Sequence, residues 1–355
     1  MTTVKDSLWT AHETTPSAIE EALRELLSER HAEHAGYTPA RVLNLVCIVD
    51  REWSGEIANR LRSVGDSHAS RTIVCSVEPG RTSLDAVATI ASDREPGPGE
   101  FALTRETIVV NVGPGHLAHL DTIVDPLVVT DIPTVVWAPH GHPEAVESLR
   151  RLAQVALIDS IDDPEVSEAL VRARSLADSL HVVVMAWLRT VPWRERLAAT
   201  FDPIPLRPQL ATISSVEVRH QPDSVASALL LLGWLASRLD WHCSPLLPSG
   251  DDLTGSAHAH RQDVTLTLAP AREMQVRGLL GLTVETASGR RLSLDRGPGG
   301  LHAEYSNYRK GIERSWTVLG ASRGEGGILG NAIRAALARD RIYLPALQAA
   351  TTMVR

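Results

Sequence analysis

Long apolar runs alternate with helix-like segments through the first half of this 355-residue chain. The run R-V-L-N-L-V-C-I-V at residues 41–49 is nearly continuous in apolar residues, which is typical of a strand covered on both faces in a parallel sheet. Further strands are predicted at 71–77, 84–91, 105–112, 133–138 and 155–159, and helices at 16–33, 55–64, 116–128, 143–153 and 164–180. This alternation predicts βαβ units, and therefore a mainly parallel sheet in an N-terminal α/β domain over residues 1–180.

The second half of the chain has a different pattern. Helices are predicted at about 193–200 and 223–239, followed by strands at 264–269, 279–287, 290–295 and 301–306 and by a final helix at about 327–339. Gly289 and the run G-P-G-G at 297–300 are typical of turns between antiparallel strands. We therefore expect an α/β protein in which the N-terminal domain packs against a C-terminal α+β domain over residues 181–355.

Composition and charge argue against several classes of protein. The net charge of −8 at pH 7 argues against nucleic acid or an anionic membrane as a partner. The N-terminal segment lacks the apolar core of a signal peptide, and the most apolar stretch, residues 225–236, is shorter than a membrane span. Three cysteines, Cys47, Cys75 and Cys243, give no disulfide framework and suit a reducing compartment, so a cytoplasmic location is expected.

The stretch N-V-G-P-G-H-L-A-H-L at 111–120 joins a predicted strand to a predicted helix, where many α/β enzymes hold phosphate. A dinucleotide fingerprint needs G-x-G-x-x-G, and no third glycine follows Gly113 and Gly115 at that spacing. Pro114 also lacks the backbone N–H that a phosphate cradle uses. We interpret the stretch as a turn and predict no bound cofactor.

Histidines occur in pairs, but the pairs lack the partners that a metal site needs. These pairs are His31 with His34, His116 with His119, His140 with His142, and His258 with His260. No cysteine or acidic residue accompanies them at a recognisable ligand spacing, so no metal site is predicted. No G-x-S-x-G motif is present, and Cys47 and Cys75 fall in predicted buried strands, where thiols are inert. We predict no catalytic residues; a redox pair of these two cysteines is the less favoured alternative.

Tryptophans and arginines lie close together in the stretch W-L-R-T-V-P-W-R-E-R-L at 187–197. A tryptophan on an apolar helix usually packs in the core, whereas clustered Trp and Arg residues are also typical of protein–protein interfaces. Both interpretations are open from the residues alone. The interface hypothesis places Trp187, Arg189, Trp193 and Arg194 in contact with a partner.

Four stretches together carry a resemblance to a known family. They are D-I-P-T-V-V-W-A-P (131–139), W-L-R-T-V-P-W-R-E-R-L (187–197), L-L-G-W-L-A-S-R-L (231–239) and I-R-A-A-L-A-R-D-R-I-Y-L-P-A-L (333–347). In order and spacing the chain resembles the OpcA family of glucose-6-phosphate dehydrogenase assembly proteins of cyanobacteria and actinobacteria. The resemblance implies a non-catalytic subunit that binds glucose-6-phosphate dehydrogenase, helps its oligomer to form and acts as an allosteric activator in the oxidative pentose phosphate pathway.

An alternative function is an enzyme or sensor that binds a sugar phosphate or a nucleotide. Its site would lie at the carboxyl ends of the N-terminal strands, near residues 113–116 and 139–142. His140, His142 and Arg105 are the candidate ligands there.

Overall fold

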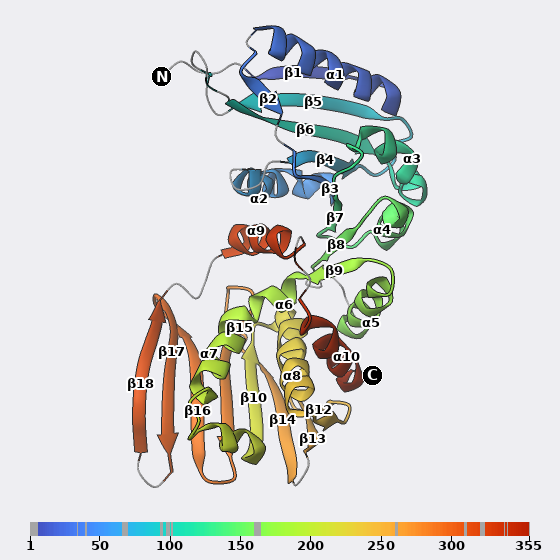
Figure 1. Cartoon of the computed structure of the whole chain (residues 1–355). Coiled ribbons are helices and arrows are strands. Elements are labelled where there is room, and N and C mark those ends of the chain that lie inside the picture. The colour runs from blue at the N-terminus through green and yellow to red at the C-terminus, as the bar shows by residue number, and fades with distance from the viewer. Residues whose placement is uncertain are drawn as a thin grey trace. The chain divides into compact units, whose positions relative to one another are not determined.

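The chain forms two compact units that interleave along the sequence. The structure, a computed structural model, describes residues 6–33, 35–39, 41–65, 70–92, 95–96, 100, 102–159, 165–259, 262–308, 311–319, 324–336, 338 and 340–354. Unit 1 comprises residues 1–159, 179–183 and 325–337, and unit 2 comprises residues 160–178, 184–324 and 338–355. Both units combine helices with a sheet, as Figure 1 shows, which confirms the predicted α/β class. The predicted division into an N-terminal domain over residues 1–180 and a C-terminal domain over residues 181–355 stays a prediction.

Unit 1 is built on one sheet. Its strands are β1 (Ser7–Ala11), β2 (Tyr37–Pro39), β3 (Leu43–Asp50), β4 (Ser70–Val77), β5 (Asp85–Ser92), β6 (Ala102–Val112), β7 (Thr134–Ala138), β8 (Val155–Ile158) and β9 (His181–Val184). They follow the order β1-β5-β6-β4-β3-β7-β8-β9, with β2 beside β6. The pairs from β6 through β4, β3 and β7 to β8 are parallel, which confirms the predicted mainly parallel sheet.

The order β6-β4-β3-β7-β8-β9 is that of a doubly wound dinucleotide-binding sheet, 3-2-1-4-5-6. Strand β3 is buried along nearly its whole length, as its continuous apolar run predicts. Strand β5 differs from its neighbours, because it forms an antiparallel hairpin with β6 and carries the antiparallel strand β1 on its other side. Alternating burial along β5 and β6 fits this arrangement.

The helices of unit 1 are α1 (Pro16–Glu33), α2 (Ser54–Gly65), α3 (Asp121–Val124), α4 (Pro143–Ser148) and α9 (Gly324–Ala336). The single helix predicted at 116–128 is wrong: this segment contains the 3₁₀ helix η2 (Pro114–His119), α3 and the 3₁₀ helix η3 (Asp125–Leu127). Pro126 explains the last break, since proline removes one backbone donor and its ring clashes with the preceding turn. The helix predicted at 143–153 ends sooner, as α4 followed by η4 (Leu149–Arg151).

Unit 2 is built on a second sheet. Its strands are β10 (Ile213–His220), β11 (His242–Cys243), β12 (Leu247–Ser249), β13 (Asp252–Ala259), β14 (Gln262–Pro270), β15 (Leu279–Thr286), β16 (Arg290–Gly297), β17 (Gly300–Asn307) and β18 (Gly311–Leu319). Their order is β11-β13-β14-β10-β15-β16-β17-β18, with β12 beside β13. The hairpin turns predicted at Gly289 and at 297–300 join β15 to β16 and β16 to β17.

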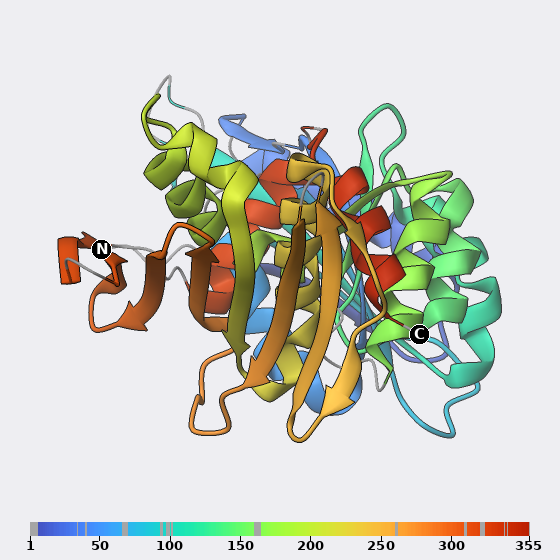
Figure 2. The same cartoon turned by 90° about the horizontal axis from the view of Figure 1, so that it is seen from below.

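The helices of unit 2 are α5 (Val166–Ala177), α6 (Met185–Arg189), α7 (Val191–Phe201), α8 (Val225–Leu239) and α10 (Tyr343–Met353). Figures 1 and 2 show α8 lying along one face of the second sheet. Helix α10 packs on α8 so closely that a Cβ on Gly233 would lie 2.2 Å from the carbonyl oxygen of Ala346. Of the helices in the described ranges, none combines the length and apolar character needed to cross a membrane.

Unit 2 contains strands that the sequence pattern did not predict, among them β10, β13 and β18, and its last helix also differs from the expectation. Strand β10, which had no predicted counterpart, lies in the middle of the sheet and pairs in parallel with β14 through the crossover that contains α8. The chain's last helix is α10, whereas the helix predicted at 327–339 is α9. Pro345 makes a helix hard to predict for this segment, because proline breaks a helix in its interior. In α10 it stands in the first turn, where proline is tolerated.

Candidate functional site

The crevice of a doubly wound sheet lies beyond the carboxyl ends of the two central strands, here β3 and β7. In a dinucleotide-binding protein the turn after the first of these strands carries glycines, so that a pyrophosphate can approach the backbone. Here Asp50 ends β3 and the 3₁₀ helix η1 (Arg51–Trp53) follows. Two carboxylates, Asp50 and Glu52, and the bulky Trp53 occupy this turn. Charge and bulk therefore both disfavour a pyrophosphate at this position.

The two histidines proposed as ligands at this edge lie close to that turn. The His142 Nε2 atom is 3.1 Å from the Asp50 Oδ1 atom, and the ring centres of His140 and Trp53 are 5.5 Å apart. His142 has a φ of 54°, a left-handed conformation that few non-glycine residues adopt. The turn after β7 thus holds the His142 side chain against the end of β3.

The third candidate ligand, Arg105, is placed elsewhere. It lies near the start of β6, a strand that ends at Val112. At about 3.3 Å per residue, the strand separates Arg105 from its carboxyl end by roughly 23 Å. The expectation that Arg105 joins His140 and His142 in one site is wrong, because position along a strand, and not only the strand itself, decides which edge a side chain reaches.

The stretch after β6 is a strand-to-helix connection, as predicted. The backbone N–H of Gly113 donates to the His116 Nδ1 atom at 3.0 Å and is therefore already used. A Cβ at Gly113 would lie 1.8 Å from the carbonyl oxygen of Arg81, so glycine is needed here for a close backbone approach. This connection is explained by packing within unit 1.

Metal-ligating side chains do not cluster within the part of the chain that the structure describes: no group of three or more His, Cys, Asp or Glu residues could hold a metal ion. His34, the partner of His31, and His260, the partner of His258, lie outside the described residues.

Cys47 and Cys75 lie on adjacent strands, where Cys47 faces Val74 and Ile48 faces Cys75. Burial raises the pKa of the Cys75 thiol to about 12 and that of Cys47 well above its usual value. Both side chains therefore act as small apolar groups near neutral pH.

The Trp/Arg stretch folds into a compact cluster in unit 2. The Arg194 guanidinium lies over the Trp187 ring, 3.5 Å from its centre, and the Arg194 Nε atom donates to the Thr190 hydroxyl at 2.8 Å. The Trp187 indole N–H donates to an Asp340 carboxylate oxygen at 2.9 Å, and the Tyr343 ring centre is 5.7 Å from that of Trp187. Burial lowers the pKa of Arg194 to about 10, against the opposing charge of Asp340. These contacts join α6, α7 and the start of α10.

All four residues of the interface hypothesis are buried in this chain. Trp193 is 1% exposed and Trp187 2%, while Arg189 and Arg194 are 6% and 7% exposed. Their side chains are therefore covered by this chain's own atoms, which is the first of the two interpretations open from the sequence. Contact with a partner through this segment stays a prediction, and it requires the outer side of α7, which presents Glu195 and Ala198 to solvent.

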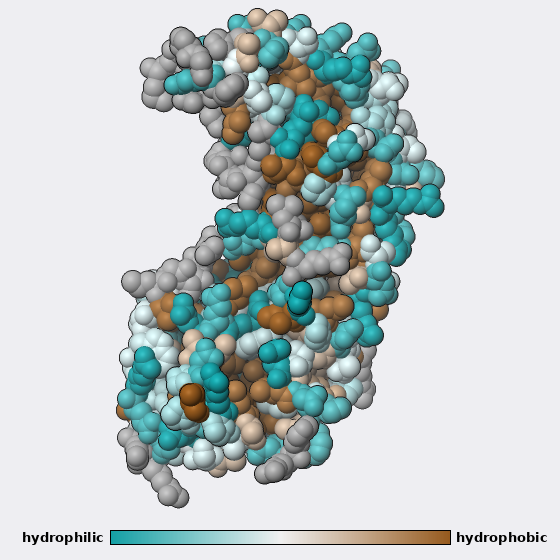
Figure 3. Space-filling view, viewed as in Figure 1, coloured by the Kyte–Doolittle hydropathy of each residue, from teal (hydrophilic) through white to brown (hydrophobic). Residues whose placement is uncertain are grey.

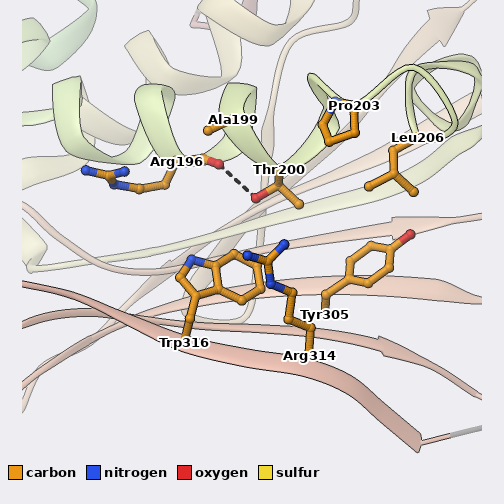
Figure 4. Close-up of a pocket in the computed structure, with 8 residues that line it drawn as sticks. All are labelled: Arg196, Ala199, Thr200, Pro203, Leu206, Tyr305, Arg314 and Trp316. Atoms are coloured by element: carbon orange, nitrogen blue, oxygen red, sulfur yellow. Dashed lines mark hydrogen bonds between the residues drawn. The ribbon is translucent and has the colours of Figure 1, made fainter.

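A hollow of about 260 Å³ lies between α7 and the last two strands of the second sheet. One wall comes from α7 and the loop after it, with Arg196, Ala199, Thr200, Pro203 and Leu206. The other wall is formed by Tyr305 of β17 and by Arg314 and Trp316 of β18. Figure 4 shows these last three side chains extending from the strands toward the helix. The sequence pattern gave no sign of this hollow, because β18 had no predicted counterpart and nothing indicated that Arg314 and Trp316 lie beside α7.

Around this hollow the surface is mixed rather than continuously apolar. Figure 3 shows small hydrophobic patches among hydrophilic residues on the visible face of unit 2. Ile204, in the loop after α7, is 77% exposed, and Ile312 of β18 is 61% exposed. Isolated exposed apolar side chains are normal on protein surfaces, so these residues alone do not mark an interface.

Comparison with known proteins relates both halves of the chain to one family. Residues 61–175 match the N-terminal domain of a glucose-6-phosphate dehydrogenase subunit, and residues 181–347 match the C-terminal domain of the same subunit. A protein of Synechococcus elongatus named as OxPP cycle protein OpcA is 27% identical over 142 residues, which are 38% of this chain and 32% of that protein. A protein of the same name from Synechocystis is 28% identical over 131 residues, 35% of this chain and 27% of that protein. The matched region thus spans about a third or less of these curated relatives.

Among solved structures, one named as oxidoreductase yvaA from Bacillus subtilis is similar over 88% of this chain and 95% of that one. Its sequence identity is 11% and the TM-score is 0.49, a likeness too weak to bear on activity. The two domain matches cover most of the chain in the expected order. The chain belongs to the OpcA family of glucose-6-phosphate dehydrogenase subunits.

Proposed function

We propose that this chain is a non-catalytic assembly subunit and allosteric activator of glucose-6-phosphate dehydrogenase in the oxidative pentose phosphate pathway. The observation that carries the proposal is the match of both domains, in order, to a subunit of that enzyme. The names of the cyanobacterial relatives, which refer to the same pathway, also support it.

The turn after β3 supports a role without dinucleotide chemistry. A dehydrogenase active site on a doubly wound sheet would need a phosphate-binding turn at this position. Asp50 and Glu52 bring two negative charges to this turn against the one positive charge of Arg51, and no glycine stands between β3 and Trp53. The fold is thus that of a nucleotide-binding protein, whereas the residues at the binding turn favour a different use of it.

Activation follows from differential affinity. The dehydrogenase exchanges between assembled, active states and less active states, and a partner that binds the active state more tightly shifts that equilibrium by its difference in affinity. A tenfold preference for the active state corresponds to about 1.4 kcal/mol, which a few well-packed contacts supply.

The predicted contact segment is α6–α7, with Trp187, Arg189, Trp193 and Arg194 on its inner side. In this arrangement the buried Trp/Arg cluster fixes the orientation of α7, and the outer side of α7 meets the dehydrogenase. Ala198, which is exposed on that side, is the point at which an added bulky charge would interfere most directly with a partner.

The experiment combines enzyme kinetics with size-exclusion chromatography of the dehydrogenase from the same organism, with and without this chain. A larger complex together with raised activity or higher substrate affinity is expected. Co-elution without a change in activity would limit the role to assembly. No complex and no change in activity would exclude the proposed function.

Two matched substitutions test the contact segment. Ala198→Arg on α7 is expected to weaken complex formation, whereas Val171→Arg on α5, which is also exposed and in the same unit, serves as the control. Equal binding by both variants and the unmodified chain would remove α7 from the interface while leaving the function itself standing.

A further inference from the structure

The hollow beside α7 contains two arginines that lack a carboxylate partner in the described part of the chain. Arg196 has its Nε atom buried without a hydrogen-bond partner there. Arg314 stacks on Trp316, with its guanidinium carbon 4.8 Å from the ring centre. Nearby Arg290 differs, because it pairs with Glu313 at 3.2 Å. Two uncompensated guanidinium groups at one hollow favour an anionic ligand, and the planar guanidinium fork suits phosphate or carboxylate oxygens.

The walls of the hollow suit an organic group attached to that anion. Trp316 and Tyr305 present aromatic surface, and Pro203 and Leu206 present apolar surface on the opposite side. The Tyr305 hydroxyl donates to the Gln209 Oε1 atom at 2.6 Å, which holds this ring in place. Such surfaces stack against the flat face of a sugar ring or a base, and a bare inorganic anion would leave them unused.

The electrostatic balance still favours an anion when the helix is included. The hollow adjoins the last turn of α7, whose carbonyl groups carry a partial negative charge of about half a unit. The two arginines bring two full positive charges, so their attraction for an anion exceeds this opposing effect. The Thr200 hydroxyl donates to the Arg196 carbonyl oxygen at 2.8 Å, and this hydrogen bond reduces the repulsion between that carbonyl group and a bound anion.

The size of the hollow narrows the class of ligand. Its volume of about 260 Å³ is just below the roughly 300–1,000 Å³ of sites for drug-sized molecules. A monosaccharide phosphate or a nucleoside monophosphate is of a suitable scale, whereas a dinucleotide would extend into solvent.

We propose that this hollow binds a small phosphate monoester, with the phosphate held by Arg314, the organic group against Trp316 and Tyr305, and Arg196 on the opposite wall adding a second attractive charge. The proposal concerns this chain alone. It is independent of the dehydrogenase and of whether α7 lies at an interface, and a ligand bound here would contact the same helix that the proposed function assigns to the partner.

Calorimetric titration of the full chain tests the proposal without the dehydrogenase. The probes are glucose 6-phosphate, adenosine 5′-monophosphate, inorganic phosphate and unphosphorylated glucose. At least one of the two esters is expected to bind, inorganic phosphate at least tenfold more weakly, and glucose not measurably. The two esters distinguish a sugar from a nucleoside as the organic group.

Substitutions locate the site. Arg314→Gln is expected to weaken ester binding by about tenfold or more, since it removes a charge-assisted contact, and Arg196→Gln by a smaller factor, since it removes only an attractive charge. Trp316→Ala is expected to weaken the ester and leave the affinity for inorganic phosphate unchanged. Arg272→Gln, at an exposed arginine of the same unit that pairs with Asp251, is the control and should bind as the unmodified chain does.

Several outcomes would overturn the proposal. One is that neither ester binds the unmodified chain at millimolar concentration. Another is that both arginine variants, with unchanged thermal unfolding, bind as tightly as the control. Inorganic phosphate binding as tightly as the esters would refute the role of Trp316 and Tyr305.

Discussion

The guanidinium carbon of Arg194 lies over the indole ring of Trp187, 3.5 Å from the ring centre, inside unit 2. The buried Arg194 cation has lost its contact with water. In its place it has a cation–π contact with the indole, a hydrogen bond to the Thr190 hydroxyl and the electrostatic attraction of Asp340. Residue types that are common in binding hot spots here stabilise the chain's own fold. The outer side of α7, held in place by this pair, is consequently the surface to test for partner binding.

Replacing Arg194 by Ala is expected to lower the free energy of unfolding by about 2 kcal/mol or more, because a desolvated cation–π contact and a charge-assisted hydrogen bond are lost together. Urea unfolding followed by circular dichroism measures this change. Arg272→Ala, at an exposed ion pair, should stay within about 0.5 kcal/mol of the unmodified chain. Equal stability of the two variants would contradict a stabilising role for Arg194.

Glu106 is expected to be the most sensitive carboxylate of unit 1. It is 1% exposed and accepts hydrogen bonds from the Nε atoms of Arg41 and Arg71, both at 2.6 Å. Glu106→Gln leaves two guanidinium groups without their counter-charge, so a loss of about 3–5 kcal/mol is expected in urea unfolding. Glu25→Gln, at an exposed position of α1, is the control. A loss below 1 kcal/mol for Glu106→Gln would show that the two arginines do not depend on this carboxylate.

Gly113 and Gly115 offer a matched pair of substitutions in one turn. A Cβ at position 113 would meet the Arg81 carbonyl oxygen at 1.8 Å, whereas nothing lies within 4 Å of a Cβ at position 115. Gly113→Ala is therefore expected to destabilise the chain by about 1–3 kcal/mol and Gly115→Ala by no more than about 0.5 kcal/mol. Thermal unfolding of both variants checks the prediction, and the reverse order of their stabilities would refute it.

Alkaline pH is expected to destabilise the fold through Cys47 and Cys75. Burial raises the pKa of both thiols, to about 12 for Cys75, whereas an unfolded cysteine ionises near a pKa of about 8.5. Between these values the unfolded state binds fewer protons than the native state, so stability is full below pH 8.5 and falls as the pH rises. The slope approaches about 1.4 kcal/mol per pH unit for each thiol.

Urea unfolding at pH 7, 8.5 and 9.5 measures this slope, and Cys75→Ala should reduce it. In the native state both thiols should react slowly with a thiol reagent at pH 8 and become accessible in urea. Fast labelling of Cys75 in the native chain would mean that its strand opens readily, and would revive a redox role for this residue.

The sequence pattern was informative where a single physical rule dominates. The continuous apolar run at 41–49 predicted β3 in the interior of a parallel sheet because burial on both faces leaves no polar positions. It failed at β10, where I-S-S-V-E-V-R-H is only half buried, and at α10, where Pro345 stands in the first turn. The local sequence pattern does not show whether a segment with few apolar residues, such as β10, lies at the centre of a sheet.

The site depended on contacts between distant parts of the sequence. The cluster of tryptophan and arginine at 187–197 was visible, but its burial depends on Asp340 and Tyr343, about 150 residues later. The hollow at Arg196 depends on Arg314 and Trp316 in a strand that was not predicted. No spacing rule links such positions, since only the pairing of β17 with β18 brings them beside α7.

Interleaving of the two units affects how the protein is made. The segment 325–337 of unit 1, which contains most of α9, is synthesised only after the long segment 184–324 of unit 2. At about 5–20 residues per second, translation of that segment takes on the order of 10 s. During this interval the strands of unit 1 have been translated without the last segment of their unit, so unit 1 is completed only after the sheet of unit 2 has been synthesised.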